Sequence, residues 1–535
     1  MKHYFVVLTI SVLPFIGMFL TPDMPHTHDG PVHLARIAAY YKELSYGQIP
    51  PRWASELNYG YGMPLFNFMY HLPYLIASVP VMFSLGLVTA FKLTLLLSFL
   101  LSGVGMFMFA RKFFGDIHKA YLVTLLYQFA PFHLVELVVR GSIGEAYTYS
   151  FLPFVLFGIL LVFEKPTFKH IFITALATTL LILSHNAISL VNFGVAALFV
   201  LWFAQGFKRR LTGFVALATG LGLTAFYWLP AVLERKYTYG DLFMRTMYQS
   251  HFPPLQNFVI PNFTNATNLQ TGGITVYLGL MQTIAVLATL CVLISKTIHD
   301  SRIRSVAKFA FIIIGASFFF MQPISAWIWE KIPTLRMFQF PWRLLTVAGL
   351  GTALLGWVLV PQRKKIRTIT VIGFCTITVL STIVFWQPPL GYDKIVESDY
   401  WNFPLNTTFF GETDLIWSEG PAKSYPHAPF ELIDGKGQIS EPYKKSVRHS
   451  FTINAQTPVR ILDHTQYFPG WRAYVDGVKT PIEFQDQNHR GRITFNVEAG
   501  VHKVVVIFGS SPVRTIGNSI SLITLFVIAL FSLVP

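Results

Sequence analysis

The chain has 535 residues, of which 53% are hydrophobic and only 13% charged, with a formal net charge of +15. A soluble globular protein carries about 25% charged residues, so this composition excludes an ordinary soluble fold and indicates a protein solvated by lipid. The basic residues fall mainly in short clusters between apolar runs, such as Lys208-Arg209-Arg210. That placement is typical of the cytoplasmic loops of membrane proteins and argues against nucleic acid as a partner.

The apolar runs predict a multi-pass protein with about twelve spanning helices. They cover residues 4–20, 89–110, 120–134, 147–163, 170–186, 188–204, 212–230, 275–295, 306–322, 342–360, 367–386 and 515–533. A further run, His71 to Gly86, is read as a helix along the membrane interface, because a thirteenth span would move most basic clusters to the outer side. We therefore expect the protein in the plasma membrane, with both termini in the cytoplasm.

The predicted fold class is therefore mainly α, a polytopic membrane helix bundle with a C-terminal β-rich domain outside the cytoplasm. We expect the bundle over residues 1–386, with an outer loop at 21–88, the extracytoplasmic domain over 387–514, and a final transmembrane helix at 515–535. From about residue 446 apolar and polar residues alternate between turn signals, which predicts a β-sandwich. Three Asn-x-Thr sequons also fall on the outer side, at Asn262, Asn265 and Asn406.

The first outer loop carries a polar stripe behind an acidic residue. Asp29 precedes Gly30-Pro31 and a helical pattern, so Asp29, His33, Arg36 and Tyr40 would share one helix face. A carboxylate at that position could remove a proton from an acceptor hydroxyl as a general base. The plainer interpretation is a residue that caps the helix.

A metal site is a third interpretation of the same loop. His26, His28, Asp29 and His33 have side chains that bind divalent metals, although their spacing matches no standard zinc pattern. The sequence therefore predicts no certain cofactor and leaves a divalent metal open.

Three further outer segments carry polar residues at the ends of spans. Arg140 and Glu145 flank one turn, where they could form a structural ion pair or place a second acid opposite Asp29 with an arginine for phosphate. His185-Asn186 closes another span, where a histidine usually caps a helix. Trp342-Arg343 enters a later span, and Arg343 could either reach the lipid headgroups or hold a lipid-linked phosphate.

These motifs resemble the GT-C superfamily of membrane glycosyltransferases, which take sugars from polyprenyl-phosphate donors. More narrowly, the chain is similar to YfhO-type bacterial membrane proteins and to those labelled "6-pyruvoyl-tetrahydropterin synthase-related", a label that implies no pterin chemistry here. The motifs that carry this resemblance are His28-Asp29-Gly30 with His33 and Arg36, Gly62-x-Pro64-Leu65-Phe66, Arg140-Gly141 with Glu145, Phe340-Pro341-Trp342-Arg343, and Tyr467 through Gly477 in the β-rich domain.

The resemblance implies a base or metal-linked acid at Asp29 and a second acid at Glu145. We expect Arg343, Arg140 and Arg36 to bind the donor phosphate. The remaining residues expected at the substrate are His28, His33, His185, Asn186 and Trp342.

The function expected is an inverting transfer of a sugar from a polyprenyl-phosphate carrier to an extracytoplasmic acceptor, which is a cell-wall polymer, a glycolipid or a protein. Two alternatives stay open, a transporter or flippase for lipid-linked glycans and a non-catalytic assembly factor. Because Asp29, Arg140, Glu145, His185 and Arg343 all fall at the outer membrane level, one shared site predicts that they converge, with the Asp29 and Glu145 carboxylates within about 10 Å of each other.

Overall fold

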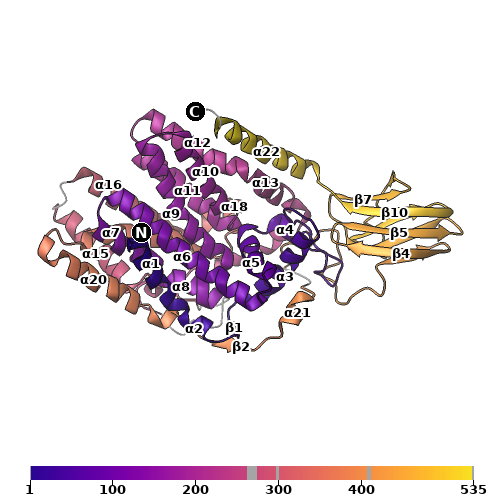
Figure 1. Cartoon of the computed structure of the whole chain (residues 1–535), viewed down its shortest axis with the longest axis horizontal. Coiled ribbons are helices and arrows are strands. Elements are labelled where there is room, and N and C mark those ends of the chain that lie inside the picture. Colours follow the sequence, from indigo (N-terminus) through magenta and orange to yellow (C-terminus); the bar gives the residue numbers. More distant parts are fainter. Residues whose placement is uncertain (1, 262–273, 297–299, 406–410, 533–535) are drawn as a thin grey trace.

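A computed structural model of the chain describes residues 2–261, 274–296, 300–405 and 411–532. The sequons at Asn262, Asn265 and Asn406 lie outside these ranges. Helices form an elongated bundle, and a β-rich domain projects from one end of it (Figure 1). The fold class predicted from composition and periodicity is therefore confirmed.

The longer helices of the bundle follow one another through most of the chain. They are α1 Lys2–Val12, α3 Gly30–Ser45, α5 Leu72–Met82, α6 Leu87–Phe114, α7 Ile117–Gln128, α9 Ile143–Glu164, α10 Phe168–Ile182, α11 Asn186–Phe203, α12 Phe207–Leu223, α13 Ala225–Leu233, α15 Leu280–Ile294, α16 Ser301–Phe320, α19 Leu345–Leu355, α20 Lys364–Leu380 and α22 Pro512–Ser532. Short helices join them: α2 Ile16–Phe19, α4 Leu65–Phe68, α8 Pro131–Val135, α14 Gly240–Phe243, α17 Ala326–Lys331, α18 Pro333–Arg336 and α21 Glu397–Trp401.

In the described residues, eight helical stretches are long and apolar enough to cross a membrane, or ten if each of two bent pairs counts as one span. The bent pairs are residues 117–140 and 207–233. The expected spans at 170–186 and 275–295 correspond to α10 and α15, which have only 15 residues each and fall below the length of a full span. The count of about twelve therefore stays a prediction.

Helix α5 is the segment that was expected at the interface. Its 11 residues rise about 16 Å at 1.5 Å per residue, roughly half of a hydrocarbon core. It packs against α3 and α6. At its C-terminal end, Met82 and the adjacent Phe83 are exposed on the protein surface. A short apolar helix of this kind fits the interfacial interpretation.

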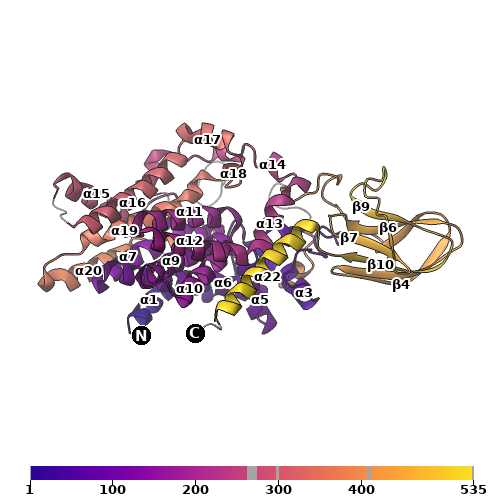
Figure 2. The ribbon, with the colours of Figure 1, turned by 90° about the horizontal axis from the view of Figure 1, so that it is seen from above.

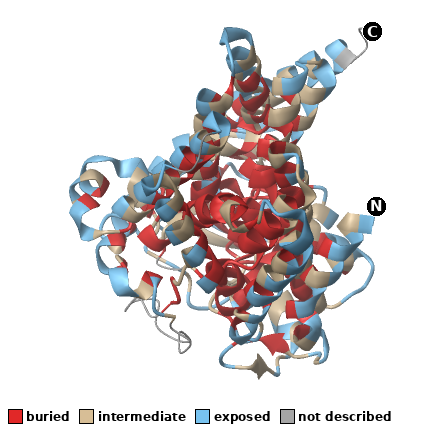
Figure 3. Ribbon diagram, turned by 90° about the vertical axis from the view of Figure 1, so that its left-hand side faces the viewer, coloured by how far each residue is buried: buried red, intermediate tan, exposed pale blue. Residues whose placement is uncertain are grey.

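Burial divides the bundle into a dry centre and an apolar surface. Buried residues fill the middle of the bundle, and exposed positions lie around its rim (Figure 3). Many exposed positions are large apolar side chains, such as Ile369 on α20 and Leu522 and Phe526 on α22. Exposing such a large apolar surface to water is unfavourable, whereas contact with lipid tails is not. These faces are therefore suited to the bilayer.

The β-rich domain consists of two antiparallel sheets packed face to face (Figure 2). The five-stranded sheet has the order β4-β5-β10-β7-β8 and the three-stranded sheet the order β3-β6-β9. Their bounds are β3 Phe430–Asp434, β4 Gly437–Lys445, β5 Arg448–Ala455, β6 Val459–Gln466, β7 Trp471–Val475, β8 Val478–Thr480, β9 Arg492–Val497 and β10 Gly500–Phe508. A separate two-stranded ribbon, β1 Met24–Pro25 with β2 Tyr392–Asp393, ties the first outer loop to the segment after α20.

The sandwich begins at Phe430, earlier than the expected start near residue 446. The physical reason is that β3 and β4 are edge strands with few buried residues, so their sequences lack the alternation of a half-buried strand. Strand β5 alternates in burial as expected, and β6, β7, β9 and β10 lie where alternation in the sequence predicts strands.

Buried polar contacts join the sandwich to the membrane part. The carboxylate of Glu43 on α3 accepts hydrogen bonds from Ser446 Oγ at 2.6 Å and from the Ser55 backbone at 2.7 Å. Helix α22 then leaves the sandwich and returns along α12 and α13 (Figure 2). Its Arg514 forms an ion pair with Glu234 at 3.4 Å, and both side chains are buried. The domain is thus fastened to the outer loop on one side and to the bundle on the other.

A buried ion pair also joins the two sheets of the sandwich, and it predicts a pH dependence. Burial opposes ionisation of Asp463 on β6, but His449 on β5 at 2.7 Å and Lys444 at 3.9 Å outweigh it and hold the pKa of this carboxyl below its ordinary 3.8. A lowered pKa means that the stabilisation is present above about pH 4 and is lost as pH falls through the folded-state value. We expect Asp463→Asn to cost about 2 kcal/mol at neutral pH, and this cost to shrink progressively as pH falls below about 4.

Hydrogen exchange of strands β5 and β6 in the full-length protein checks this expectation. Wild type and Asp463→Asn are compared at each pH, so that the intrinsic pH dependence of exchange cancels. A difference in protection that stays constant from neutral pH down to pH 3 would contradict it.

Candidate active site

The loop before α3 and the turn before α9 meet edge to edge. The backbone N–H of His28 donates to Val139 at 3.0 Å, and that of Asp29 donates to Arg140 at 2.8 Å. Gly141 makes this approach feasible, since it has a φ of +67° and a Cβ there would lie 2.5 Å from the Thr27 hydroxyl. The Arg140-Gly141 motif therefore places Asp29 directly beside Arg140.

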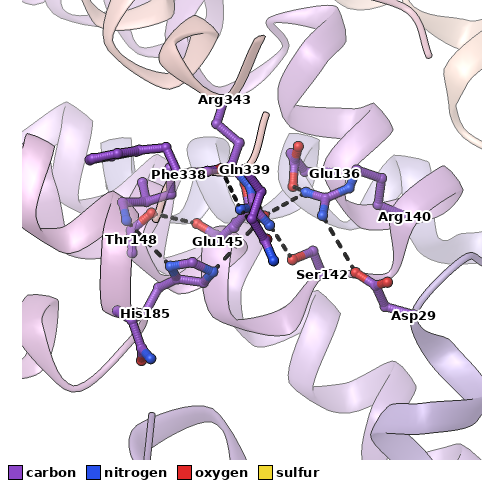
Figure 4. A network of polar contacts seen from close by, with 12 residues as sticks. Asp29, Glu136, Arg140, Ser142, Glu145, Thr148, His185, Phe338, Gln339 and Arg343 are labelled. Carbon is purple, nitrogen blue, oxygen red and sulfur yellow. Dashed lines mark hydrogen bonds and ion pairs between the residues drawn. The ribbon is translucent and has the colours of Figure 1, made fainter. Parts of the chain in front are cut away.

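The guanidinium of Arg140 is surrounded by three carboxylates (Figure 4). Its Nη1 lies 2.6 Å from Glu136 and 2.6 Å from Glu145, and its Nη2 lies 3.5 Å from Asp29. Two carboxylates that contact one planar guanidinium lie within about 10 Å of each other, so the Asp29 and Glu145 carboxylates are as close as one shared site requires. Arg140, Glu136 and Glu145 are buried, whereas the Asp29 side chain is 32% exposed.

Arg343 reaches the same cluster from the other half of the chain. It lies in a 3-10 turn, Pro341–Leu344, and its Nε is 2.9 Å from Glu145. Its Nη1 donates to the Phe338 carbonyl at 2.7 Å and to the Gln339 side chain at 2.8 Å. Glu145 is thus shared by two arginines (Figure 4).

Aromatic rings cover both guanidinium groups. The ring of Trp342 lies 4.9 Å from the Arg140 guanidinium, and that of Phe340 lies 4.8 Å from Arg343. The two rings stack on each other at 4.9 Å. Trp342 is buried and its ring covers the Arg140 guanidinium. In this structure it therefore packs against the cluster and is not open to a substrate.

Two plainer interpretations of these residues are wrong. The Asp29 side chain makes no capping hydrogen bond to α3, and the Thr27 hydroxyl accepts the bond from Gly30 instead, at 3.1 Å. Arg343 does not reach outward to headgroups, because it is 6% exposed and paired with Glu145. For Arg140 and Glu145 the structure shows the ion pair, at 2.6 Å.

The polar stripe of α3 faces the protein, not solvent. His33 is hydrogen-bonded to the Tyr74 hydroxyl at 3.0 Å and Tyr40 to His71 at 3.2 Å. Burial lowers the pKa of His33 well below its ordinary value, and Arg36 and Arg140 act in the same direction, so the ring is neutral at neutral pH. Arg36 is buried beside Tyr74, and its Nε has no hydrogen-bond partner among the residues that the structure describes.

His185 and Asn186 differ in their relation to the cluster. His185 caps α11 by accepting from the Ile188 backbone at 3.3 Å, and its other ring nitrogen lies 4.0 Å from Glu145. Asn186 has both ends of its amide occupied elsewhere, by the Phe68 carbonyl at 2.5 Å and by the Tyr227 hydroxyl. The structure brings His185 to the cluster and gives Asn186 a different set of contacts.

The predicted metal ligands do not gather at one point. His26 pairs with Asp393 at 2.9 Å on the β1–β2 ribbon, and His33 bonds to Tyr74. In the described part of the chain no three His, Cys, Asp or Glu side chains come together in a way that could hold a metal ion. Of the four predicted ligands, His28 and Asp29 are left beside the cluster, and two residues are too few to hold a metal ion.

Sequence reasoning missed Glu136, Tyr70 and Tyr74. Glu136 lies one helical turn before Arg140, on a π-helical turn Glu136–Arg140 inside a span, so only its spacing from Arg140 could have indicated it. Tyr70 stacks on Tyr74 at 5.4 Å and on His185 at 5.2 Å, which links α5 to the cluster. Aromatic residues are common at membrane interfaces, so no pattern in the sequence distinguishes these two tyrosines from the others.

Residues 66–387 match the family model described as "6-pyruvoyl-tetrahydropterin synthase related domain; membrane protein". The matched range covers more than half of the chain. The chain belongs to this family. The family expected from the motifs is thus confirmed, and the match contains Arg140, Glu145, His185 and Arg343 but begins after Asp29.

Solved structures with a similar course of the chain are distant. The arabinofuranosyltransferase AftD from Mycobacteria aligns with 14% identity and a TM-score of 0.43, over 76% of this chain and 26% of its own. ArnT from Cupriavidus metallidurans aligns with 16% identity and a TM-score of 0.30, over 66% of this chain and 77% of its own. The chain thus spans about a quarter of the length of AftD. A comparison with curated proteins gives no match.

The shared carboxylate predicts a large effect of Glu145 on stability. Glu145→Ala leaves two buried guanidinium groups without their common partner, and breaking a buried ion pair costs about 3 kcal/mol or more. Unfolding of the purified protein in detergent, followed by circular dichroism, measures this loss. The matched control is Asp29→Asn at the partly exposed end of the cluster, expected to cost about 1 kcal/mol or less. Equal effects of the two substitutions would contradict the expectation.

Proposed function

We propose that this membrane protein is a glycosyltransferase that moves a sugar from a polyprenyl-phosphate carrier to an acceptor hydroxyl outside the cytoplasm, with inversion at the anomeric carbon. One observation carries the proposal. In a cluster of buried charges, the Asp29 carboxylate is the one that is partly exposed, and Arg140 and the backbone bonds to residues 139 and 140 hold it in place. A positioned, accessible carboxylate is what a general base requires.

In the proposed step, Asp29 takes the proton of the acceptor hydroxyl as that oxygen bonds to the anomeric carbon. The bond from the anomeric carbon to the donor phosphate oxygen breaks, and the lipid phosphate leaves with the bonding electron pair. A single displacement of this kind inverts the anomeric centre. Phosphate is a good leaving group, so electrostatic stabilisation of its charge suffices without a strong general acid.

The arginines divide into two roles. Arg140 and Arg343 already neutralise Glu136 and Glu145, so we assign them to holding Asp29 and the loop geometry in place. Arg36 is on α3, which begins directly after Asp29, and is hydrogen-bonded to a tyrosine. Arg36 is therefore the arginine that we assign to the departing phosphate. Glu145, buried and shared, acts in this proposal as a positioning residue.

Transport of a lipid-linked glycan is the competing function. Transporters place ionisable groups near the bilayer midplane. Here Glu145 and Arg343 stand in the first turns of their spans, Ile143–Glu164 and Pro341–Leu359. That position supports chemistry at an interface more than passage through the bilayer. Translocation of a labelled lipid-linked sugar by protein that leaves it intact would favour transport instead.

Asp29→Asn is expected to reduce sugar transfer by about a hundredfold or more, because the amide cannot accept the proton. The assay is transfer from a polyprenyl-phosphate sugar in reconstituted vesicles, with the product anomer determined by NMR. Asp23→Asn is the matched control, an acid in the same loop that lies outside the cluster, and it should retain activity. Undiminished turnover of Asp29→Asn, or a product of retained configuration, would overturn the base assignment.

The side of the membrane is tested by labelling single cysteines in cells. In a protein whose Cys291 and Cys375 are replaced, we expect Tyr443→Cys in the sandwich to react with an impermeant maleimide in intact cells. Lys208→Cys, in the basic cluster at the start of α12, should react only after permeabilisation. The reverse pattern would place the site on the cytoplasmic side and refute the extracytoplasmic acceptor.

A further inference from the structure

A cleft of about 320 Å³ opens between the end of α3 and the edge strand β4. Tyr46, Glu56, Asn402, Tyr425 and Lys445 are among the residues that line it. They come from the first outer loop, the segment after α20 and the sandwich, so the cleft exists only because the sandwich sits on the outer loop. None of these residues belongs to the charge cluster around Arg140.

The cleft is separated from Asp29 by the length of one helix. Asp29 directly precedes α3 and Tyr46 directly follows it, and the 16 residues between them span about 24 Å. A single sugar cannot occupy both places. A chain of several sugars can.

The lining combines aromatic faces with hydroxyl-binding groups. Tyr425 is 53% exposed, and its ring is held by an edge-to-face contact with Tyr59 at 5.2 Å and by its hydroxyl, which donates to the Asn402 carbonyl at 3.1 Å. A fixed, open aromatic ring suits the C–H face of a sugar. Carboxylate, amide and ammonium groups beside it can bond to the hydroxyls.

The side chains that line the cleft are held in position by contacts with neighbouring residues. Glu56 forms an ion pair with Lys42 and accepts from the Tyr46 hydroxyl at 3.2 Å, and the ammonium of Lys445 lies 4.1 Å from the Tyr46 ring. The buried Glu43 fixes Ser55 and Ser446, which also line the cleft. A site whose side chains are already ordered loses little entropy when it binds a ligand.

We propose that this cleft binds the acceptor, and that the acceptor is an oligosaccharide or polysaccharide long enough to reach Asp29. The inference rests on the proposed glycosyl transfer for its second part, while binding of carbohydrate in the cleft is independent of it. Tyr425 supplies the stacking face, Glu56 and Asn402 bond to hydroxyls, and Lys445 adds a donor that also suits an anionic substituent.

Binding is measured directly on the full-length protein in lipid nanodiscs by calorimetric titration with short linear glucan, mannan and N-acetylglucosamine oligosaccharides. We expect at least one series to bind, with affinity rising with chain length. Tyr425→Ala should weaken binding about tenfold through loss of the stacking face, and Tyr425→Phe, which keeps the ring, should retain most of it. Tyr474→Ala on β7, three strands from β4 in the same sheet, is the matched control and should bind as wild type.

Asp29→Asn separates the two proposals. It should bind the oligosaccharide like wild type while losing transfer, because it changes the chemical site and leaves the cleft intact. Loss of binding in Asp29→Asn, unchanged binding in Tyr425→Ala, or capture of peptide acceptors in place of oligosaccharides would overturn the cleft assignment. Oligosaccharide binding that depends on Tyr425, in a protein without transfer activity, would refute the glycosyltransferase proposal and uphold the cleft.

Discussion

The burial of one guanidinium group, that of Arg140, constrains the end of the bundle where α3 and α9 begin. A buried ion costs several kcal/mol unless opposite charges and hydrogen bonds surround it. Here the partners come from the loop before α3, from the π-helical turn that contains Arg140 itself, and from the first turn of α9. Glu145 then extends the requirement to Arg343, in a segment two hundred positions later in the chain. Bent helices and a left-handed glycine at Gly141 are the means by which these segments reach one point.

The same principle recurs where the sandwich meets the membrane part. Glu43 is buried but accepts hydrogen bonds from Ser55, Gln48 and Ser446. Glu234 likewise accepts a hydrogen bond from the Asn67 side-chain amide at 2.8 Å and forms an ion pair with Arg514. Each buried carboxylate therefore joins elements that the apolar surface alone would leave free to slide, since hydrophobic contact is not directional and hydrogen bonds are. Helix α3 is central in this arrangement, because its first residue borders the charge cluster and its last turns border the sandwich.

Sequence patterns predicted most of the fold because two of its determinants act locally. Lipid requires long apolar helices, so runs such as Leu87–Phe114 are visible in the sequence without any knowledge of their neighbours. Alternation likewise revealed β5, β6, β7, β9 and β10, whose inner faces are buried. The edge strands β3, β4 and β8 were missed because exposure removes the alternation. The short helices α10 and α15 show a related limit, since an apolar composition does not fix where a helix ends.

For the site, the sequence by itself determined which residues had unusual chemistry for their position, namely an acid, arginines and a histidine at the ends of apolar spans. It also predicted that they share one membrane level, from the count of spans and the placement of charges. Only the tertiary structure decided that Asp29 is not a cap, that Arg343 points inward, and that Glu136, Tyr70 and Tyr74 complete the cluster. Those facts depend on contacts between segments far apart in the chain. The residues next to a carboxylate in the sequence do not indicate which distant guanidinium will neutralise it.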